Sequence, residues 1–346
     1  TLVEGKGAES PDFMNVGFGD PCIVADRESD RVMVMSCAGN VAYVKGQRDY
    51  HQGIARFYSE DGGKTWSAPT DIAESIYSQF DDGKYGPARA MFIASGKVLQ
   101  SRYVKTGKYY RLYCAVLQTV ANGEWMNFVL YSDDFGESWK VLGGVDTAPI
   151  VKGADEAKVE ELPGGNLLIS SRTNANGRNF NIFTFTNEKR AEGSWGEMAH
   201  SSKHNGGVYS DRNACNGELL VVPVVRNSDG REMYLLLQSL PLGPYRANVG
   251  IYYKGLESAA DVATPARIAE KWEGSYRVSN ETSAYSTMVL QSDNSIGFLY
   301  EERELYDKRG GGYSIVYDNL SVEQITDGSY VINPRAGKKL WKSYRR

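Results

Sequence analysis

The side chains able to carry chemistry in this sequence are carboxylates, arginines and tyrosines. The three histidines, His51, His200 and His204, are scattered along 346 residues. Zinc sites, Ser-His-Asp triads and Cys-His dyads all need a histidine close to further ligands or to a nucleophile. An enzyme with this sequence would therefore use Asp, Glu, Arg and Tyr, and we assign it no metal site and no cofactor.

The four cysteines do not form a disulfide framework, because four in a chain of this length are too few. They contain no C-x-x-C pair, and none lies beside a histidine that could share a ligand role. We interpret Cys22, Cys37, Cys114 and Cys215 as buried free thiols.

Charge and hydropathy exclude two kinds of partner. The chain has 39 Lys and Arg against 43 Asp and Glu, a net charge of -4, so it has no basic excess for a nucleic acid backbone. No apolar run approaches the roughly 18 residues that span a membrane. The start of the chain also lacks the charged head and apolar stretch of a signal peptide, and we expect a processed or trimmed form.

One element, a polar turn followed by an apolar strand, recurs five times. Its turns are marked by Asp30, Gly96, Gly165, Gly217 and Asp293. Each copy is followed by another β-rich run, and helical periodicity is weak except for a short piece at residues 257–261. Five repeats of several strands predict the blades of a β-propeller.

A sharper motif follows the first two repeats: Ser59-x-Asp61-x-Gly63-x-Thr65-Trp66, and then Ser132-x-Asp134-x-Gly136-x-Ser138-Trp139. In such an octet the Asp can cap backbone N–H groups of a tight turn, the Gly can take a positive φ, and the Trp can bury between strands. Degraded copies end at Trp195 and Trp272. We therefore assign both aspartates to turns and keep them out of the active site.

The two octets resemble the Asp boxes of the six-bladed bacterial sialidases (neuraminidases), and further segments match that family in order over roughly residues 12–325. The segment Glu156-Ala157-Lys158-Val159-Glu160-Glu161, followed by Pro163-Gly164-Gly165 and then Arg172, resembles the one that carries the family's catalytic glutamate and second arginine. The resemblance implies these roles for Glu156 and Arg172. The alternative is a pair of surface charges at the ends of a hairpin.

Three other segments complete the resemblance. Tyr245-Arg246-Ala247-Asn248 lies where the family places its third arginine, and Ser283-Ala284-Tyr285-Ser286 with the later Glu301 matches the nucleophile blade. Gly19-Asp20-Pro21 resembles the opening of the second blade. The resemblance implies that Tyr285 is the nucleophile, Glu301 supports an arginine, and Asp20 contacts a sugar hydroxyl. The alternatives are a surface cation for Arg246, a packed core tyrosine for Tyr285 and an ordinary Asp-Pro turn for Asp20.

The chemistry explains these residue types. Sialic acid has a carboxylate on the carbon that is attacked, so a neutral phenol avoids the repulsion that a carboxylate nucleophile would meet; sialidases are a known exception among glycosidases in this respect. A phenol with a solution pKa of ~10 needs a base, a role implied for Glu156. The substrate carboxylate needs bidentate, permanently charged partners, which Arg172 and Arg246 would supply.

The sequence departs from the family at the first blade. The motif Arg-Ile-Pro, which carries the first arginine, is absent, and the loop with the general-acid aspartate has no counterpart. Arg48 and Asp49 precede an Asp-box strand, but their flanks match the second blade, so they receive no role. We expect a six-bladed β-propeller whose first blade is missing from this chain and belongs to a preceding segment, with residues 1–15 bordering the gap.

The leading functional hypothesis is a retaining exo-sialidase that acts on sialylated glycans or glycoproteins, in the periplasm or outside the cell. Two alternatives stay open: a propeller that binds sialylated glycans without cleaving them, and an intramolecular trans-sialidase. We assign residues 1–330 to the propeller, as blades two to six, and residues 331–346 to a basic, solvated C-terminal tail.

Overall fold

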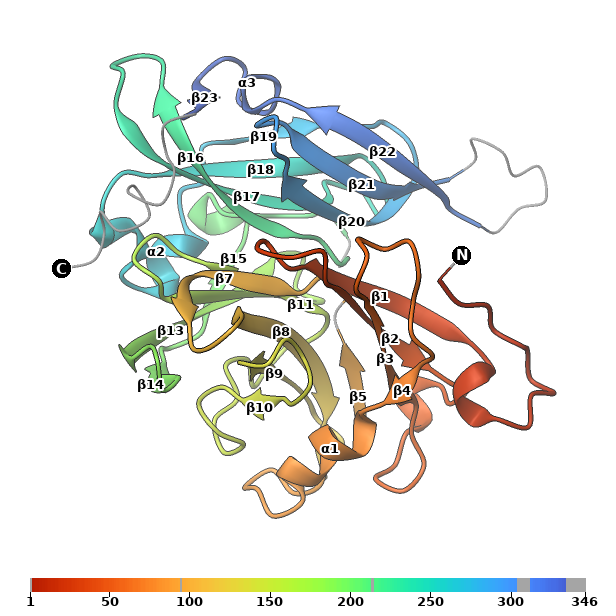
Figure 1. Cartoon of the computed structure of the whole chain (residues 1–346). Coiled ribbons are helices and arrows are strands. Elements are labelled where there is room, and N and C mark those ends of the chain that lie inside the picture. Colours follow the sequence, from red (N-terminus) through yellow and green to blue (C-terminus); the bar gives the residue numbers. More distant parts are fainter. Residues whose placement is uncertain (1, 94, 213–214, 304–311, 334–346) are drawn as a thin grey trace. The chain divides into compact units, whose positions relative to one another are not determined.

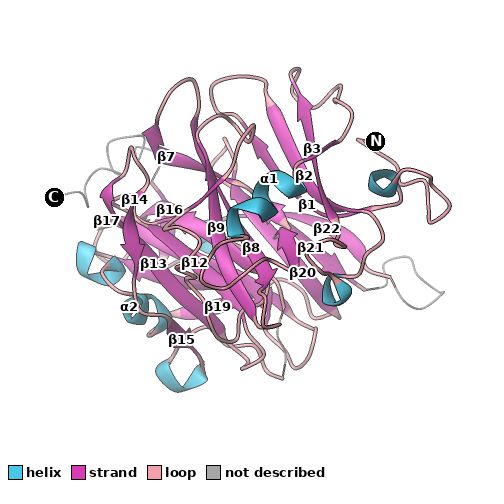
Figure 2. Cartoon of the chain, turned by 90° about the horizontal axis from the view of Figure 1, so that it is seen from below, coloured by secondary structure: helices cyan, strands magenta, loops and turns pink. Residues whose placement is uncertain are grey.

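The computed structural model describes residues 2–93, 95–212, 215–303 and 312–333, and strands dominate its secondary structure (Figure 1). The helices among these residues are short, as the few cyan segments of Figure 2 show, and none exceeds five residues. They are α1 (Ala73–Tyr77), α2 (Pro265–Ala269), α3 (Val322–Ile325) and the 3-10 helices η1 (Phe13–Asn15), η2 (Tyr43–Lys45), η3 (Ser78–Phe80), η4 (Lys203–Asn205) and η5 (Ala259–Val262). The expected short helical piece is η5, shifted by two residues.

The chain divides into two compact units, one of Thr1–Val159 with Phe185–Trp195 and the other of Glu160–Thr184 with Gly196–Arg346. The first unit contains two five-stranded sheets. The first sheet has the order β4 (Thr70–Asp71), β3 (Gly53–Ser59), β2 (Val32–Ala38), β1 (Phe18–Ala25), β6 (Gly96–Lys97). The second has the order β10 (Lys140–Val141), β9 (Trp125–Ser132), β8 (Tyr110–Thr119), β5 (Ala90–Ile93), and β7 (Leu99–Lys105) also pairs with β8.

The third sheet has residues in both units. Its order is β11 (Ala157–Glu161), β12 (Leu167–Arg172), β13 (Arg178–Asn187), β14 (Glu192–Trp195), and β15 (Ala199–Ser201) also pairs with β13.

The second unit contains the fourth and fifth sheets. The fourth has the order β19 (Gly274–Arg277), β18 (Val249–Leu256), β17 (Glu232–Pro241), β16 (Leu219–Arg226), β23 (Tyr330–Ile332). The fifth has three strands, β20 (Ser283–Leu290), β21 (Ile296–Glu302) and β22 (Ser314–Leu320). The apolar strands of the five predicted repeats fall in five different sheets, although Gly96, the turn of the second repeat, pairs with β1 of the first sheet as part of β6. The expected all-β fold with five propeller blades is confirmed.

Apolar side chains from facing sheets form the cores of the units. In the first unit Cys22, Met35, Cys114 and Phe128 belong to one buried cluster that joins β1 and β2 to β8 and β9. In the second unit one cluster joins strands of the fourth and fifth sheets, and another joins β12 and β13 to β16 and β17. Burial of this apolar surface is the main force that holds the sheets together.

Both Asp-box octets form the predicted turns. Asp61 accepts hydrogen bonds from the backbone and the hydroxyl of Thr65 at 2.9 and 2.6 Å, and Asp134 accepts the matching pair from Ser138 at 2.9 and 2.6 Å. Gly63 and Gly136 take φ values of 88° and 84°, as expected. These bonds lower the pKa of both aspartates, and they satisfy backbone donors that would otherwise be unpaired.

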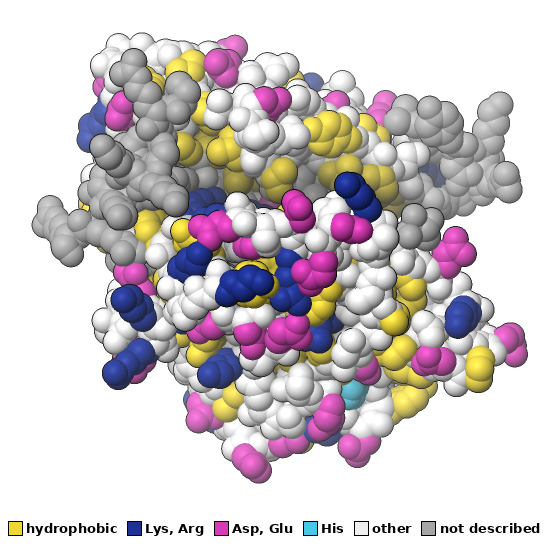
Figure 3. Space-filling view, in the orientation of Figure 1, with side chains coloured by type: hydrophobic (Ala, Val, Ile, Leu, Met, Phe, Trp, Pro, Cys, Tyr) yellow, Lys and Arg dark blue, Asp and Glu magenta, His cyan; other side chains and the backbone are white. Residues whose placement is uncertain are grey.

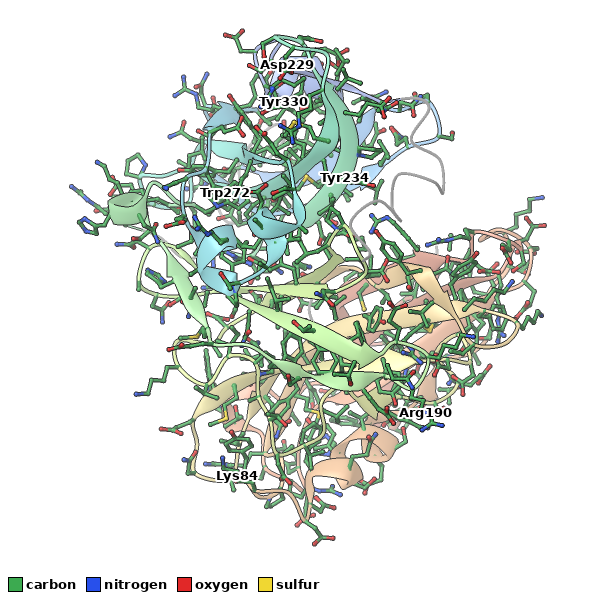
Figure 4. The ribbon with its side chains drawn as sticks, turned by 90° about the vertical axis from the view of Figure 1, so that its left-hand side faces the viewer. Lys84, Arg190, Asp229, Tyr234, Trp272 and Tyr330 are labelled. Carbon is green, nitrogen blue, oxygen red and sulfur yellow. The ribbon has the colours of Figure 1, made fainter. Side chains whose placement is uncertain are left out.

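The tryptophans of the octets differ in burial. Trp139 is buried with the core cluster of the first unit, as predicted, whereas Trp66 is only partly buried at the edge of a smaller cluster. The expectation that both are buried is wrong for Trp66, because fewer side chains cover its ring. In the second unit Trp272, labelled in Figure 4, packs 6.2 Å from Phe180 and 6.4 Å from Tyr252 between ring centroids.

The four cysteines are free and buried, as predicted. Within the described parts of the chain no cluster of three His, Cys, Asp or Glu side chains could hold a metal ion, and no helix there is long and apolar enough to cross a membrane. On the face seen in Figure 3, acidic and basic side chains lie interspersed.

Segments near both ends of the described chain pack against or pair with the sheets. Leu2, Val3 and Met14 pack against Val34 and Phe57 of the first sheet. At the other end, β23 pairs antiparallel with β16, so the fourth sheet continues past the expected boundary at residue 330. The rest of the expected tail, residues 334–346, lies outside the described residues.

Candidate active site

Tyr285 lies on β20, and two side-chain hydrogen bonds fix the strand beside it. The hydroxyls of Ser286 and Ser239 lie 2.8 Å apart, and Thr287 donates to a carboxylate oxygen of Glu218 at 3.0 Å. Both contacts join β20 to the fourth sheet or to the turn that precedes β16. Tyr285 itself is half-buried, so its position is defined while its ring remains accessible.

Glu301 lies on β21 and contacts the same residue. Its Oε2 accepts a hydrogen bond from the Tyr285 amide at 3.0 Å. This bond falls where the register between β20 and β21 shifts, between Ser283 and Ser286. At such a shift the strand ladder is interrupted, and here the backbone amide donates to a side chain. The resemblance implied support of an arginine, and the contact found here supports the backbone of Tyr285.

Arg172 ends β12 and points at Tyr285. Its Nη1 lies 3.5 Å from the Tyr285 hydroxyl oxygen, at the long limit of a hydrogen bond. Strand pairing places Arg172 opposite Arg178 at the end of the β12–β13 ladder. Arg178 is fully buried and donates to Ser170 and to the Cys215 carbonyl, so its side chain bonds within the core. Arg172, by contrast, is half-buried.

Arg246 lies in the loop before β18. Its guanidinium carbon is 5.8 Å from the centroid of the Tyr285 ring, and its carbonyl accepts the Ser283 amide at 2.9 Å. Tyr245 and Asn248 flank it with φ values of 61° and 60°, a strained backbone of the kind that clusters at functional sites. Burial lowers the pKa of Arg246, but neighbouring Cys215 and Tyr285 raise it, and the net pKa lies above its ordinary value.

The second unit therefore brings together Arg172, Arg246, Tyr285 and Glu301, which are separated by up to 129 positions in the sequence. Two guanidinium groups beside one phenol can bind a carboxylate and can stabilise negative charge on the phenol oxygen. The cluster contains one phenol and two groups that can bind an anion.

Glu156 and Asp20 lie in the first unit. Glu156 comes directly before β11, is 5% exposed, and donates its amide to Asp155 Oδ1 at 2.8 Å. Asp20 is half-buried in β1 with a φ of 52°, where the pairing of β1 with β2 shifts register. Their roles toward Tyr285 and a sugar remain predictions.

Arg48 and Asp49, which received no role from the sequence, lie in the loop between η2 and β3. Arg48 forms ion pairs with Glu74 at 2.7 Å and Asp81 at 2.6 Å, which raise its pKa. Asp49 is exposed.

Sequence reasoning missed Glu218. Its side chain is fully buried, and it anchors β20 through Thr287. The turn Asn216-Gly217 that marks the fourth repeat comes directly before it, so a charged residue opening an apolar strand was the available signal.

Comparisons with known proteins agree with the motifs. The model of the BNR/Asp-box repeat matches residues 57–68, which contain the whole first octet. A sialidase of Micromonospora viridifaciens is 26% identical over 299 residues, which cover 82% of this chain and 40% of that protein. A sialidase of Bacteroides fragilis is 24% identical over 305 residues, which cover 82% of this chain and 47% of that protein. The chain thus spans less than half the length of these two relatives.

Solved structures share the fold. The Hadza microbial sialidase Hz136 superposes with a TM-score of 0.62 at 20% identity, covering 89% of this chain and 53% of that one. The intramolecular trans-sialidase from Ruminococcus gnavus gives 0.64 at 15% identity, covering 89% and 78%. The molecule is thus an all-β, propeller-type protein with a tyrosine–arginine–glutamate cluster. It resembles the bacterial sialidases in repeat, sequence and fold.

Proposed function

We propose that this protein is a retaining exo-sialidase, which hydrolyses terminal sialic acid from glycans or glycoproteins through a covalent intermediate on Tyr285. The observation that carries the proposal is that two guanidinium groups lie beside the Tyr285 phenol. Arg172 approaches its hydroxyl to 3.5 Å and Arg246 lies 5.8 Å from its ring. The relatives from Micromonospora viridifaciens and Bacteroides fragilis support the proposal, because both are sialidases.

The proposed reaction has two displacements. In the first, the Tyr285 oxygen attacks the anomeric carbon, the bond to the aglycone oxygen breaks, Glu156 takes the phenol proton, and a general acid protonates the leaving oxygen. In the second, the conjugate base of that acid takes a proton from water, the water oxygen attacks the same carbon, the bond to Tyr285 breaks, and the phenol oxygen regains its proton from Glu156. Two inversions give net retention. Arg172 and Arg246 hold the substrate carboxylate throughout.

The general acid and a third arginine would come from a sixth blade outside this sequence. The fifth sheet supports this part of the proposal, because it has three strands among the described residues and one face is apolar and open. Val289, Leu299, Ile315 and Tyr317 are 46%, 40%, 62% and 54% exposed. Monomeric proteins rarely leave such a patch uncovered.

The same open face carries Glu301. Strand pairing places Leu299 opposite Tyr317 and Glu301 opposite Ile315, so these four residues share one side of the sheet. A blade that covers the apolar part would bring its own residues beside Glu301, where an added arginine could pair with the carboxylate. Because the proposed substrates are surface glycans, we propose that this protein is located in the periplasm or outside the cell.

The nucleophile is tested with Tyr285→Phe, and Tyr300→Phe serves as the control. Tyr300 lies on β21, its side chain faces the opposite side from Glu301, and its hydroxyl donates to Asp318 at 3.1 Å. With a fluorogenic sialoside, we expect Tyr285→Phe to lower kcat by several orders of magnitude and Tyr300→Phe to leave it nearly unchanged. Incubation with 2,3-difluorosialic acid should add the sugar mass to the peptide that contains Tyr285. Full turnover by Tyr285→Phe would refute the role.

Product analysis separates the alternatives. Hydrolysis with retention releases the α-anomer first, which NMR detects before mutarotation. Transfer to a hydroxyl of the same sugar gives an anhydro product instead, and binding without cleavage gives a saturable association with no product.

The sixth blade is tested by Ile315→Lys in the longest native form of the polypeptide. If a blade covers this side chain, burying a charge should lower stability by about 1–3 kcal/mol, whereas surface substitutions stay within about 0.5 kcal/mol. Val44→Lys is the control, because Val44 is 73% exposed in η2. Equal melting temperatures for the two variants would show that no blade covers this face and would refute the proposed sixth blade.

A further inference from the structure

Asn127 on β9 holds the segment that leads to Glu156. The Asn127 amide donates to the Ile150 carbonyl at 3.1 Å, and its side-chain Nδ2 donates to the Asp155 carbonyl at 2.7 Å. All of these atoms belong to the first unit. Backbone and side chain of a single residue thus fix both ends of residues 150–155.

A second contact passes this restraint on to Glu156. The Glu156 amide donates to Asp155 Oδ1 at 2.8 Å, so the residue that Asn127 holds by its carbonyl also fixes the backbone of Glu156 by its carboxylate. Asp155 and Glu156 are 9% and 5% exposed, which leaves water little access to compete for these bonds. The chain of contacts runs from Asn127 through Asp155 to Glu156.

Packing alone does not account for an asparagine at this position. Asn127 is fully buried on a strand whose next residues, Phe128, Val129 and Leu130, are apolar and equally buried. A primary amide in such surroundings costs free energy unless it is hydrogen-bonded. Its shortest side-chain bond is to Asp155, and its contact with the Val116 carbonyl is longer, at 3.4 Å. The shorter of its two side-chain bonds therefore goes to the segment before Glu156.

We propose that Asn127 is a positioning residue that sets the location of the Glu156 carboxylate through Asp155. The inference rests on the proposed function, in which Glu156 is the base. It adds a residue that makes no contact with substrate and that acts by holding the segment 150–156 in place. Misplacing a catalytic group by about 1 Å can cost on the order of 100-fold in rate, so the effect is measurable.

The test compares Asn127→Ala, Asn127→Asp and a matched control, Asn181→Ala. Asn181 is 2% exposed and its Nδ2 also donates to a backbone carbonyl, that of Gly196 at 3.0 Å, but it lies on β13 away from residues 150–156 in the sequence. We expect Asn127→Ala to lower kcat by roughly 10- to 100-fold with KM within about threefold. Asn181→Ala should lower the melting temperature by about as much as Asn127→Ala does, and it should leave kcat unchanged.

The pH profile of Asn127→Asp distinguishes a hydrogen-bond donor from a packing role. An ionised carboxylate cannot donate to the Asp155 carbonyl, whereas a protonated carboxyl group can. The activity of Asn127→Asp relative to the unsubstituted protein should therefore rise as pH falls. A ratio that is constant with pH would overturn the donor role.

Hydrogen exchange tests the inference independently of turnover. Mass spectrometry of peptides that cover residues 150–156 should give faster exchange in Asn127→Ala and unchanged exchange in Asn181→Ala. Unchanged exchange in both variants, or full kcat in folded Asn127→Ala, would overturn the proposal. If the unsubstituted protein cleaves no sialoside, the proposed function fails, and the exchange result alone decides whether Asn127 holds this segment.

Discussion

The main-chain amide of Tyr285 donates a hydrogen bond to Glu301 Oε2 at 3.0 Å across the β20–β21 pair. The proposed nucleophile is thus held by its backbone, while its hydroxyl oxygen lies 3.5 Å from Arg172 Nη1. Because the bond occurs at a register shift, it fixes the one stretch of β20 that the regular ladder does not hold.

This bond predicts different effects for two substitutions of Glu301. Glu301→Gln keeps an oxygen acceptor for the Tyr285 amide, so we expect kcat within a few-fold of the original. Glu301→Ala removes the acceptor and should lower kcat by about 100-fold, as a misplaced nucleophile does. Steady-state kinetics on a fluorogenic sialoside measure both. Equal losses would show that the charge, and not the backbone bond, is what matters.

Substituting the arginines by lysine should weaken substrate binding. Lysine keeps the charge of Arg172 or Arg246 but loses the planar pair of donors, which is worth about 1.5–3 kcal/mol for a bond to a charged group. We expect KM to rise by roughly 10- to 100-fold in each variant. Arg48→Lys is the control. A comparable rise in KM there would make Arg48 the third arginine and remove the need for a sixth blade to supply it.

Asp134→Ala should destabilise the first unit without affecting catalysis. Loss of a side-chain cap costs about 1 kcal/mol, and partial exposure keeps the effect at that level. The melting temperature measures it, and kcat per folded molecule should stay unchanged. A large loss of kcat at an unchanged melting temperature would place this turn in the active site.

The contribution of Asp134 should depend on pH. Burial alone raises the pKa of Asp134, but hydrogen bonds from Ser138 and Ser132 outweigh it and lower the pKa below the ordinary value. A carboxyl group with a lowered pKa in the folded state stabilises the fold above about pH 4 and loses that effect as pH falls further. The difference in melting temperature between the original protein and Asp134→Asn should therefore be present at neutral pH and shrink below about pH 4.

The thiols should be inert in the folded protein. Burial raises the pKa of Cys37 to about 12, and a hydrogen bond with Cys114 is the main cause that raises the pKa of Cys22. Because the thiolate is the reactive form, a disulfide reagent at mildly alkaline pH should modify none of the four cysteines before unfolding and all four in denaturant. Fewer than four in denaturant would indicate a disulfide.

The order of the motifs in the sequence predicted most residues of the candidate site, but not the contacts between them. The positions of Glu156, Arg172, Arg246, Tyr285 and Glu301 came from motif order, and four of them meet in the second unit. The contact between Glu301 and the Tyr285 amide could not be predicted, because it depends on a local register shift that no spacing in the sequence encodes. The role proposed for Asn127 was equally invisible, since a single polar residue in an apolar strand has no local pattern.

The sequence by itself determined the all-β class, the five sheets and both Asp-box turns, because alternating strands and tight turns depend on residues within a few positions of each other. Only the tertiary structure decided that β23 pairs with β16 from about a hundred residues away, and that Trp139 is buried while Trp66 is half-covered. Similar local motifs reach different environments because burial depends on the neighbours that distant segments supply, and those contacts form only when the whole chain folds.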